Sequence, residues 1–348
     1  STDFGKKNVE SLDGAAVKQA LLEAGLFGYI NQLPYAVSTT PDTTPKAIFV
    51  SALRDMPLAA DFEVELAGNE EAFQAGLTAL SKIAKTYLGV GVEQHCNALG
   101  EAKNVEINVF DGPCPAGNVG VQVNNIDPVN KGEVVWTVDP ASVIFFGRLF
   151  LTGKVDLHKK VAVAGSEMKQ TGYANVLVGT PFSAFVEAQL KATEHVRLIN
   201  GNPLTGTKST LADYVGGHTS EITAIPEGDD CDEMLGWILP RTNQFSTSRS
   251  YLSWLFGKKK EYDLDARIKG GERHMIMSGE YDQVLPMDIF GEYLIKAIIA
   301  GDIDKQEQLG IYEVIPEDFA VAEFVDSSKL ELQKIVRDGL NILRKENA

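Results

Sequence analysis

The spacing of apolar residues predicts two amphipathic helices in the first quarter of the chain. In residues 12–30, Asp13 is a suitable N-cap, and Val17, Leu21 and Leu22 fall on one helical face. Residues 69–87 repeat this spacing after a second suitable N-cap, Asn69. The apolar stripe of this helix consists of Phe73, Leu77, Leu80 and Ala84. Each helix is therefore expected to lay one face on a core.

Two strands are predicted around the second helix. Residues 47–52, AIFVSA, form a short continuous apolar run, which is typical of a buried parallel strand. Residues 104–110, NVEINVF, alternate between apolar and polar positions. A strand, a helix and a second strand in this order indicate a parallel βαβ unit, so a Rossmann-like domain is expected over residues 46–157.

The rest of the chain divides into segments of different character. Residues 1–45 hold the first helix and a Pro/Thr linker, STTPDTTP. Residues 158–273 contain short strand-like runs around glycines, which suit a β-grasp domain with a β-rich extension. Residues 274–348 are predicted to be a C-terminal helical domain. Its last helix, in 329–347, carries Leu332, Ile335, Val336, Leu340 and Leu343 on one face. The fold class expected is therefore α/β and α+β, multidomain.

Composition and charge exclude several classes of function. The 348 residues are 44% apolar and carry a net charge of −16. An acidic surface argues against nucleic acid as a partner, because phosphate binding needs a basic face. The three cysteines, Cys96, Cys114 and Cys231, are too far apart to suggest a disulfide framework or a metal-ligand set. No apolar run reaches the length of a transmembrane helix.

A nucleotide cradle is missing at its usual place. A dinucleotide site needs a Gly-rich turn directly after the first strand, where backbone N–H groups hold the pyrophosphate. Here the strand at 47–52 is followed by LRDMPLAADFEVELAG, with no glycine before Gly68. The GVG at 89–91 is a weak substitute because it follows a helix and opens a strand.

The loop that begins VFDGPCPAGNVG at residue 109 admits two interpretations. Cys114 is a candidate nucleophile, but a reactive thiol needs a lowered pKa, and Pro113 and Pro115 prevent a helix from starting on it. The alternative is a rigid loop, in which Asp111, Gly112 and Pro113 form a fixed turn and Gly117 allows close backbone approach.

No catalytic residue or metal ligand stands out elsewhere. His218 and His274 are isolated and fit no metal-binding spacing, so no metal site is expected. An aromatic run at 25–35, GLFGYINQLPY, allows two interpretations. Its residues could line a flat apolar slot for a quinone-like ring, or they could pack the leading helix onto the next domain. The residues concerned are Phe27, Tyr29, Leu33, Pro34 and Tyr35.

Several long motifs resemble a known family. They are FDGPCPAGNVGVQVNNIDPVNKGEVVW (110–136), VIFFGRLFLTG (143–153), LINGNPLTGT (198–207), GWILPRTNQFSTSRSYL (236–252) and GEYDQVLPMD (279–288). In this order they resemble the A subunit of the bacterial Na⁺-translocating NADH:quinone oxidoreductase, without its N-terminal domain. The A subunit is similar to the flavin-binding subunit of complex I and to the iron–sulfur subunit of the Rnf complex.

The resemblance implies a peripheral subunit on the cytoplasmic face of the bacterial inner membrane. Its partners would be the other subunits of the complex, which hold the flavins and iron–sulfur centres and oxidise NADH. The chain itself would bind no cofactor, with quinone as its possible ligand. The domain order implied is Rossmann-like, then β-grasp of the soluble-ligand-binding type, then helical.

The C-terminal region departs from the Rnf pattern where clusters would bind. A [4Fe–4S] cluster needs cysteine thiolates. Alignment of the two C-terminal segments places the eight cysteines of the Rnf protein on Met275, Ser278, Tyr281, Leu285, Pro316, Phe319, Ala322 and Asp326. Two readings remain open: an accessory subunit that helps to form a quinone site, and an assembly subunit with no ligand. A self-sufficient NADH–flavin dehydrogenase is disfavoured.

Overall fold

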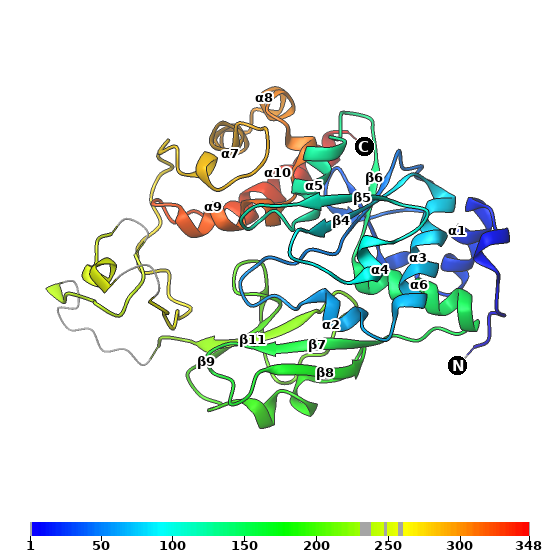
Figure 1. The fold of residues 1–348 in the computed structure, drawn as a ribbon. Coiled ribbons are helices and arrows are strands. Elements are labelled where there is room, and N and C mark those ends of the chain that lie inside the picture. Colours follow the sequence, from blue (N-terminus) through cyan, green and yellow to red (C-terminus); the bar gives the residue numbers. More distant parts are fainter. Residues whose placement is uncertain (1, 230–237, 247–248, 257–259, 348) are drawn as a thin grey trace.

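The structure, a computed structural model, describes residues 2–229, 238–246, 249–256 and 260–347. Cys231 and part of the motif at 236–252 therefore lie outside the described residues. Two separate sheets and several groups of helices make up the described chain (Figure 1). The protein is thus a mixed α/β protein, as expected.

The first sheet has six strands in the order β2-β1-β6-β3-β4-β5. The central strands β3 (Ile48–Ser51), β4 (Thr86–Gly91), β5 (Glu106–Phe110) and β6 (Val135–Val138) run parallel. The hairpin of β1 (Ile30–Leu33) and β2 (Val37–Ser38) adds antiparallel strands at the β6 edge. The leading segment of the chain therefore contributes to this sheet.

The first predicted helix is shorter than expected. The helix α1 (Gly14–Glu23) starts as predicted, since the Asp13 side chain accepts a hydrogen bond from the Ala16 N–H. It ends at a Schellman motif in which Gly25 is left-handed, with φ +71°, and the Leu26 N–H bonds to the Leu21 carbonyl at 2.9 Å. The chain then passes through a short 3₁₀ turn, η2 (Phe27–Tyr29), into β1. The prediction of a helix to residue 30 was wrong because Gly25 stops it.

The second predicted helix was too long at its C-terminal end. The helix α3 (Glu70–Ile83) stops before TYLGVG, which forms β4 instead. This run is buried on both faces, so the strand at 86–91 closes the first βαβ unit and the predicted strand at 104–110 becomes the sheet edge. Asn69 does not cap α3 with its side chain. Its Oδ1 accepts from Arg148 at 2.7 Å, and its Nδ2 donates to the Glu65 carbonyl at 2.8 Å.

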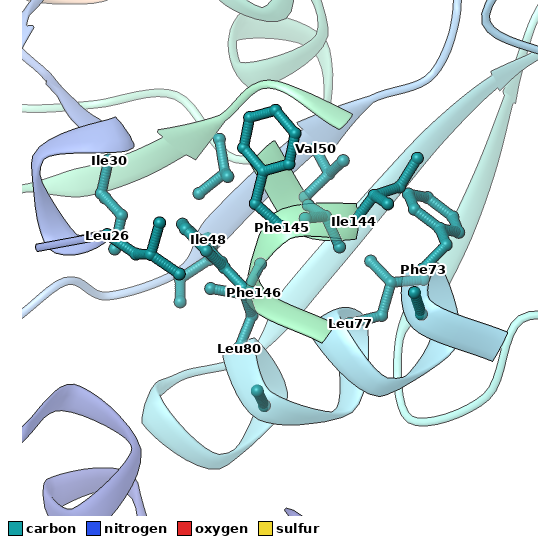
Figure 2. Close-up of a cluster of buried hydrophobic side chains, with 14 of the residues drawn as sticks. Leu26, Ile30, Ile48, Val50, Phe73, Leu77, Leu80, Ile144, Phe145 and Phe146 are labelled. Carbon is teal, nitrogen blue, oxygen red and sulfur yellow. The ribbon is translucent and has the colours of Figure 1, made fainter. Parts of the chain in front are cut away.

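Helices cover both faces of the first sheet. On one face, α3 and α6 (Pro140–Thr152) pack together with α1 over Ile48 and Val50 (Figure 2). A Cβ on Gly147 would lie 1.6 Å from the Ala72 carbonyl oxygen, so glycine lets α3 and α6 approach closely. On the other face, Val123 of α5 (Val119–Ile126) packs with Phe49. Two shorter helices, α2 (Phe62–Leu66) and α4 (Asn97–Gly100), lie at the sheet ends.

The second sheet has five strands in the order β10-β9-β11-β7-β8. They are β7 (His158–Ala164), β8 (Gly172–Leu177), β9 (Val196–Asn200), β10 (Thr207–Ser209) and β11 (Glu221–Pro226). Only the β11–β7 pair is parallel. Two 3₁₀ turns, η3 (Phe182–Ala184) and η4 (Glu187–Gln189), pack on this sheet and complete its core.

The described part of residues 274–347 contains helices and no strand. The α-helices are α7 (Gly291–Ala300), α8 (Ile303–Gln308), α9 (Ala320–Val325) and α10 (Leu332–Glu346). The 3₁₀ turns η7 (Tyr281–Gln283), η8 (Ile311–Glu313) and η9 (Pro316–Phe319) connect them. Four residues of the predicted stripe on the last helix are fully buried, namely Leu332, Val336, Leu340 and Leu343. None of the helices in the described ranges has the length and apolar character needed to cross a membrane.

Candidate functional site at the junction of the two sheets

The candidate site lies at the carboxyl ends of β3 and β6. The chain runs through β3, β4 and β5 in one direction and then returns to place β6 beside β3. Ligands of open α/β sheets bind outside the carboxyl ends of the strands at the point where the strand order reverses. The second sheet faces this point through α2, because the Lys160 Nζ donates to the Val64 carbonyl at 2.7 Å and the Ala60 N–H donates to Glu221 Oε2 at 3.0 Å.

A pocket of about 560 Å³ opens at this junction. Its walls come from the loop after β3, the loop before α5, the loops 200–206 and 216–221 of the second sheet, and Glu317. Much of the lining is glycine backbone. A Cβ on Gly217 would lie 2.2 Å from Cε1 of Tyr29, so the Tyr29 ring stands directly behind this wall. The His218 ring packs edge-on to the same tyrosine, with centroids 5.8 Å apart.

Four largely buried charges hold the floor of the junction. Arg54 follows β3 and reaches Glu65 Oε2 at 3.4 Å and Asp139 Oδ1 at 3.3 Å. Lys159, on β7, donates to the Gly217 carbonyl at 3.1 Å. Burial tends to raise the pKa of Asp139, but the charges of Arg54 and Lys159 outweigh it and hold that pKa below its usual value. Burial raises the pKa of Glu65 and lowers the pKa of Lys159.

The loop at 111–118 is anchored by its second half. Asp111, Gly112 and Pro113 are exposed, whereas Gly117 is buried. The Gly117 N–H donates to Asp55 Oδ2 at 2.9 Å, and the Gly117 carbonyl accepts from Ser51 Oγ at 2.8 Å. A Cβ on Gly117 would lie 2.6 Å from Asp55 Oδ1. A Cβ there would also lie 2.8 Å from the Leu53 carbonyl oxygen, so the loop lies close against the residues after β3.

The thiol of Cys114 is not activated. Burial, and then the charge of Asp55, raise the pKa of Cys114 to about 12. Its Sγ lies 3.4 Å from Sδ of Met56. A thiol with this pKa remains protonated at neutral pH, which argues against a nucleophilic role for Cys114.

Carboxylates occupy the helix N-termini at this edge of the sheet. Asp61 caps α2, and Asp139 caps α6 through a hydrogen bond from the Ala141 N–H at 3.0 Å. The buried Asp318 lies against the first turn of α5, where a Cβ on Gly120 would be 2.3 Å from its Oδ2. Phosphate binds at helix N-termini through free N–H groups. The residues present therefore do not fit a dinucleotide phosphate.

The structure does not bring the five aromatic-run residues into one slot. Phe27 is buried edge-on against Trp136, and Tyr29 reaches the junction pocket wall. Leu33 is buried with Phe49 on the opposite sheet face, and Pro34 follows it. Tyr35 lies against the C-terminal helices, edge-on to Tyr312 at 6.4 Å. The side chains thus lie in three separate environments.

Sequence reasoning missed the buried charges at the junction. Arg54 and Asp139 each follow a parallel strand by one to three residues, and a polar residue in that position was the signal available. Lys159 gave no signal because it lies within a strand of the other sheet. His218 borders the pocket, whereas His274 does not. In the described ranges no group of three or more His, Cys, Asp or Glu side chains could hold a metal ion.

Together these features define a multidomain α/β protein with a ligand-sized pocket at a domain junction and an unactivated thiol beside it. Two family models match: "NqrA second alpha/beta domain" over residues 12–155 and "NQRA C-terminal domain", a soluble-ligand-binding β-grasp module, over residues 160–210.

Curated relatives agree with the family models over almost the whole chain. The Na(+)-translocating NADH-quinone reductase A subunit of Vibrio vulnificus is 34% identical over 344 residues, 99% of this chain and 76% of the relative. The A subunit of Yersinia pestis is 33% identical over 350 residues, with the same coverage. This chain belongs to the NqrA family, the A subunits of the Na⁺-translocating NADH-quinone reductase, an oxidoreductase complex. The resemblance of its motifs is thereby confirmed.

A solved structure is also similar in outline. The NAD⁺-reducing [NiFe]-hydrogenase in the air-oxidized state aligns with 95% of this chain and 66% of its own, at 13% identity and a TM-score of 0.48. A likeness at this level carries no information about function.

Proposed function

We propose that this chain is a peripheral, cofactor-free subunit of a Na⁺-translocating NADH:quinone reductase complex, which contributes to quinone binding and to assembly. The family match over 99% of the chain is the observation that carries the proposal. Its partners are the other subunits, which would hold the flavins and iron–sulfur centres and oxidise NADH. Its place is the cytoplasmic face of the bacterial inner membrane.

The proposed domains follow the family order. Residues 1–45 form the N-terminal helix and linker, 46–157 a Rossmann-like domain, 158–273 the β-grasp domain with its extension, and 274–348 a C-terminal helical domain. The parallel order β6-β3-β4-β5 supports the Rossmann-like assignment. The carboxylates at the helix N-termini and the raised pKa of Cys114 support a chain that supplies no nucleotide site and no nucleophile of its own.

The junction pocket is the proposed place for the quinone ring. Of the residues proposed to bind quinone, Tyr29 is the one whose ring backs this pocket, and Phe27, Leu33, Pro34 and Tyr35 shape the segment that holds it. A planar ring fits between aromatic and backbone surfaces, and His218 offers a ring N–H to a quinone carbonyl. The loop residues Asp111, Gly112, Pro113 and Gly117 have an architectural role, with Gly117 at the pocket border.

A photoreactive short-chain quinone tests this placement. Labelled peptides from residues 25–37 and from the loop around His218 are expected, and substitution of Tyr29→Ala should reduce labelling of both. The matched control is Tyr214→Ala, because Tyr214 is an exposed tyrosine between β10 and β11, outside the pocket. Labelling confined to other regions would exclude quinone binding at this site.

A purely structural assembly subunit is the alternative function. It predicts no saturable binding of a soluble quinone to the chain in isothermal titration or ligand-observed NMR, while co-purification with the membrane subunits is retained. A flavin absorption spectrum in the purified chain would contradict both readings.

A further inference from the structure

Exposed large hydrophobic side chains are more concentrated in the segment 238–277 than in the rest of the described chain. It is 40 residues long, yet it holds 11 of the 22 large hydrophobic side chains that are exposed in the described ranges. The 3₁₀ turn η6 (Leu252–Phe256) ends with Trp254, Leu255 and Phe256, which are 50%, 60% and 62% exposed. Soluble surfaces rarely gather apolar side chains in this way without a partner.

The segment lies at one end of the molecule. In Figure 1 the yellow residues project away from both sheets, on the side opposite α1, α3 and α6.

Charge along the chain is strongly uneven. Residues 238–277 contain eight Lys and Arg against four Asp and Glu, a net charge of +4. The whole chain carries −16, so the remaining residues carry −20. Three consecutive lysines, 258–260, follow η6 in the sequence, and Lys260 Nζ lies 4.9 Å from the Phe256 ring centroid.

The exposed apolar side chains and the positive charge of this segment together favour a partner with an anionic surface and an apolar interior. Trp, Leu and Phe beside Lys and Arg are the side chains that insert at the headgroup level of a bilayer. Basic residues near an anionic leaflet are attracted to it, and the field falls within a Debye length of about 10 Å. A nucleic acid offers the negative charge without an apolar interior for these side chains.

We propose that η6, with Lys260 beside it, docks this chain on the anionic surface of a phospholipid bilayer, with Trp254, Leu255 and Phe256 at headgroup level. The inference rests on the proposed function only for the presence of a membrane. It does not depend on quinone binding.

Flotation of the chain with lipid vesicles tests the proposal. The chain is expected to float with vesicles that contain phosphatidylglycerol, and not with pure phosphatidylcholine. A double variant, Leu255→Ser with Phe256→Ser, should weaken binding about tenfold or more, because two large apolar side chains no longer insert. Raising the salt concentration should also weaken binding.

The matched control is Phe290→Ser with Tyr293→Ser. These side chains, at the start of α7, are 66% and 59% exposed, so the control removes a similar exposed apolar area outside the segment. It should float like the parent, and both variants should keep the parent unfolding midpoint. Absence of binding to anionic vesicles, or an equal loss in the control, would overturn the proposal.

A protein interface is the other outcome. In that case the parent chain does not bind vesicles, and the η6 double variant fails to co-purify with the membrane subunits. The face would then bind a protein, and the lipid proposal would be wrong. Failure of the proposed function looks different, because the parent chain itself would then not co-purify with those subunits.

Discussion

Asp139 and Asp318 lie near the same edge of the first sheet, largely shielded from solvent, in opposite electrostatic surroundings. Asp139 faces Arg54 and Lys159, and these charges hold its pKa below the usual value in spite of burial. Among the described residues, no cation acts on the pKa of Asp318 in this way. Asp318 accepts hydrogen bonds from the Ile315 N–H at 3.0 Å and from Asn118 Nδ2 at 3.3 Å. Burial raises the pKa of Asp318 to about 8.

The difference shows that neighbouring cations can outweigh burial and keep a shielded carboxylate such as Asp139 ionised. The junction of the two sheets is held by opposite charges that cannot be removed singly. The contact of α5 with the C-terminal helices is held by a carboxyl group that is mostly protonated at neutral pH. The two contacts should therefore respond differently to mutation and to pH.

The largest effect is expected from Arg54→Met, which breaks the charge balance at the junction. Glu65 and Asp139 would lose their closest cation, and an uncompensated buried charge costs about 3–5 kcal/mol of unfolding free energy. Urea unfolding at pH 7 measures the loss. The control is Lys85→Met, which breaks the exposed pair between Lys85 and Glu106 and should leave the midpoint unchanged. Equal stability of both variants would show that the junction does not depend on Arg54.

Asp318→Asn is expected to stabilise the protein, whereas Arg54→Met destabilises it. The native protein keeps a proton on Asp318 up to about pH 8, whereas an unfolded aspartate releases it near pH 4. Folding thus takes up a proton between these pH values, and stability falls as the pH rises through them. Asparagine has no proton to take up. At pH 8 the unfolding free energy of the variant should exceed that of the parent by at least about 2 kcal/mol. At pH 4 no such gain is expected.

Thermal unfolding of both proteins from pH 4 to pH 8 checks this prediction. The parent should lose stability relative to the variant across the range. Parallel curves would mean that Asp318 is ionised in the native protein and that its pKa is not raised.

A smaller effect is expected from Gly120→Ala, which tests how closely α5 packs against Asp318. The added Cβ would lie 2.3 Å from Asp318 Oδ2, so the C-terminal helices must shift, at a cost of about 1–3 kcal/mol. Gly100→Ala is the control, since a Cβ there meets nothing within 4 Å. It should be neutral or slightly stabilising. Equal unfolding midpoints in the two variants would contradict the close packing at Gly120.

The smallest effect is expected from Cys114→Ser. The nearby Asp55 charge adds to burial in raising the thiol pKa to about 12, so no thiolate is present to lose. Quinone reductase activity of the assembled complex should stay near the parent value, and stability should change by less than about 1 kcal/mol. A large loss of activity would show that the thiol takes part in the reaction.

Local patterns were enough to predict much of the fold. The apolar run at 47–52 is a parallel strand, the alternating run at 104–110 is a strand, and the Asp13 cap starts a helix. The helix ends were harder. Gly25 stops the first helix through a left-handed conformation, and TYLGVG becomes a strand because neighbours on both sides pair with it. Pairing depends on distant residues, which a local period does not report.

The sequence alone determined the family and the mixed α/β class, because these follow from long motifs and from local apolar patterns. Only the tertiary structure decided the junction site. Arg54, Asp139 and Lys159 are far apart in the chain and meet because the two sheets come together at this junction. It also decided that Asp318 lies against the first turn of α5. Electrostatic energies depend on distance and burial, and both arise only when the domains come together.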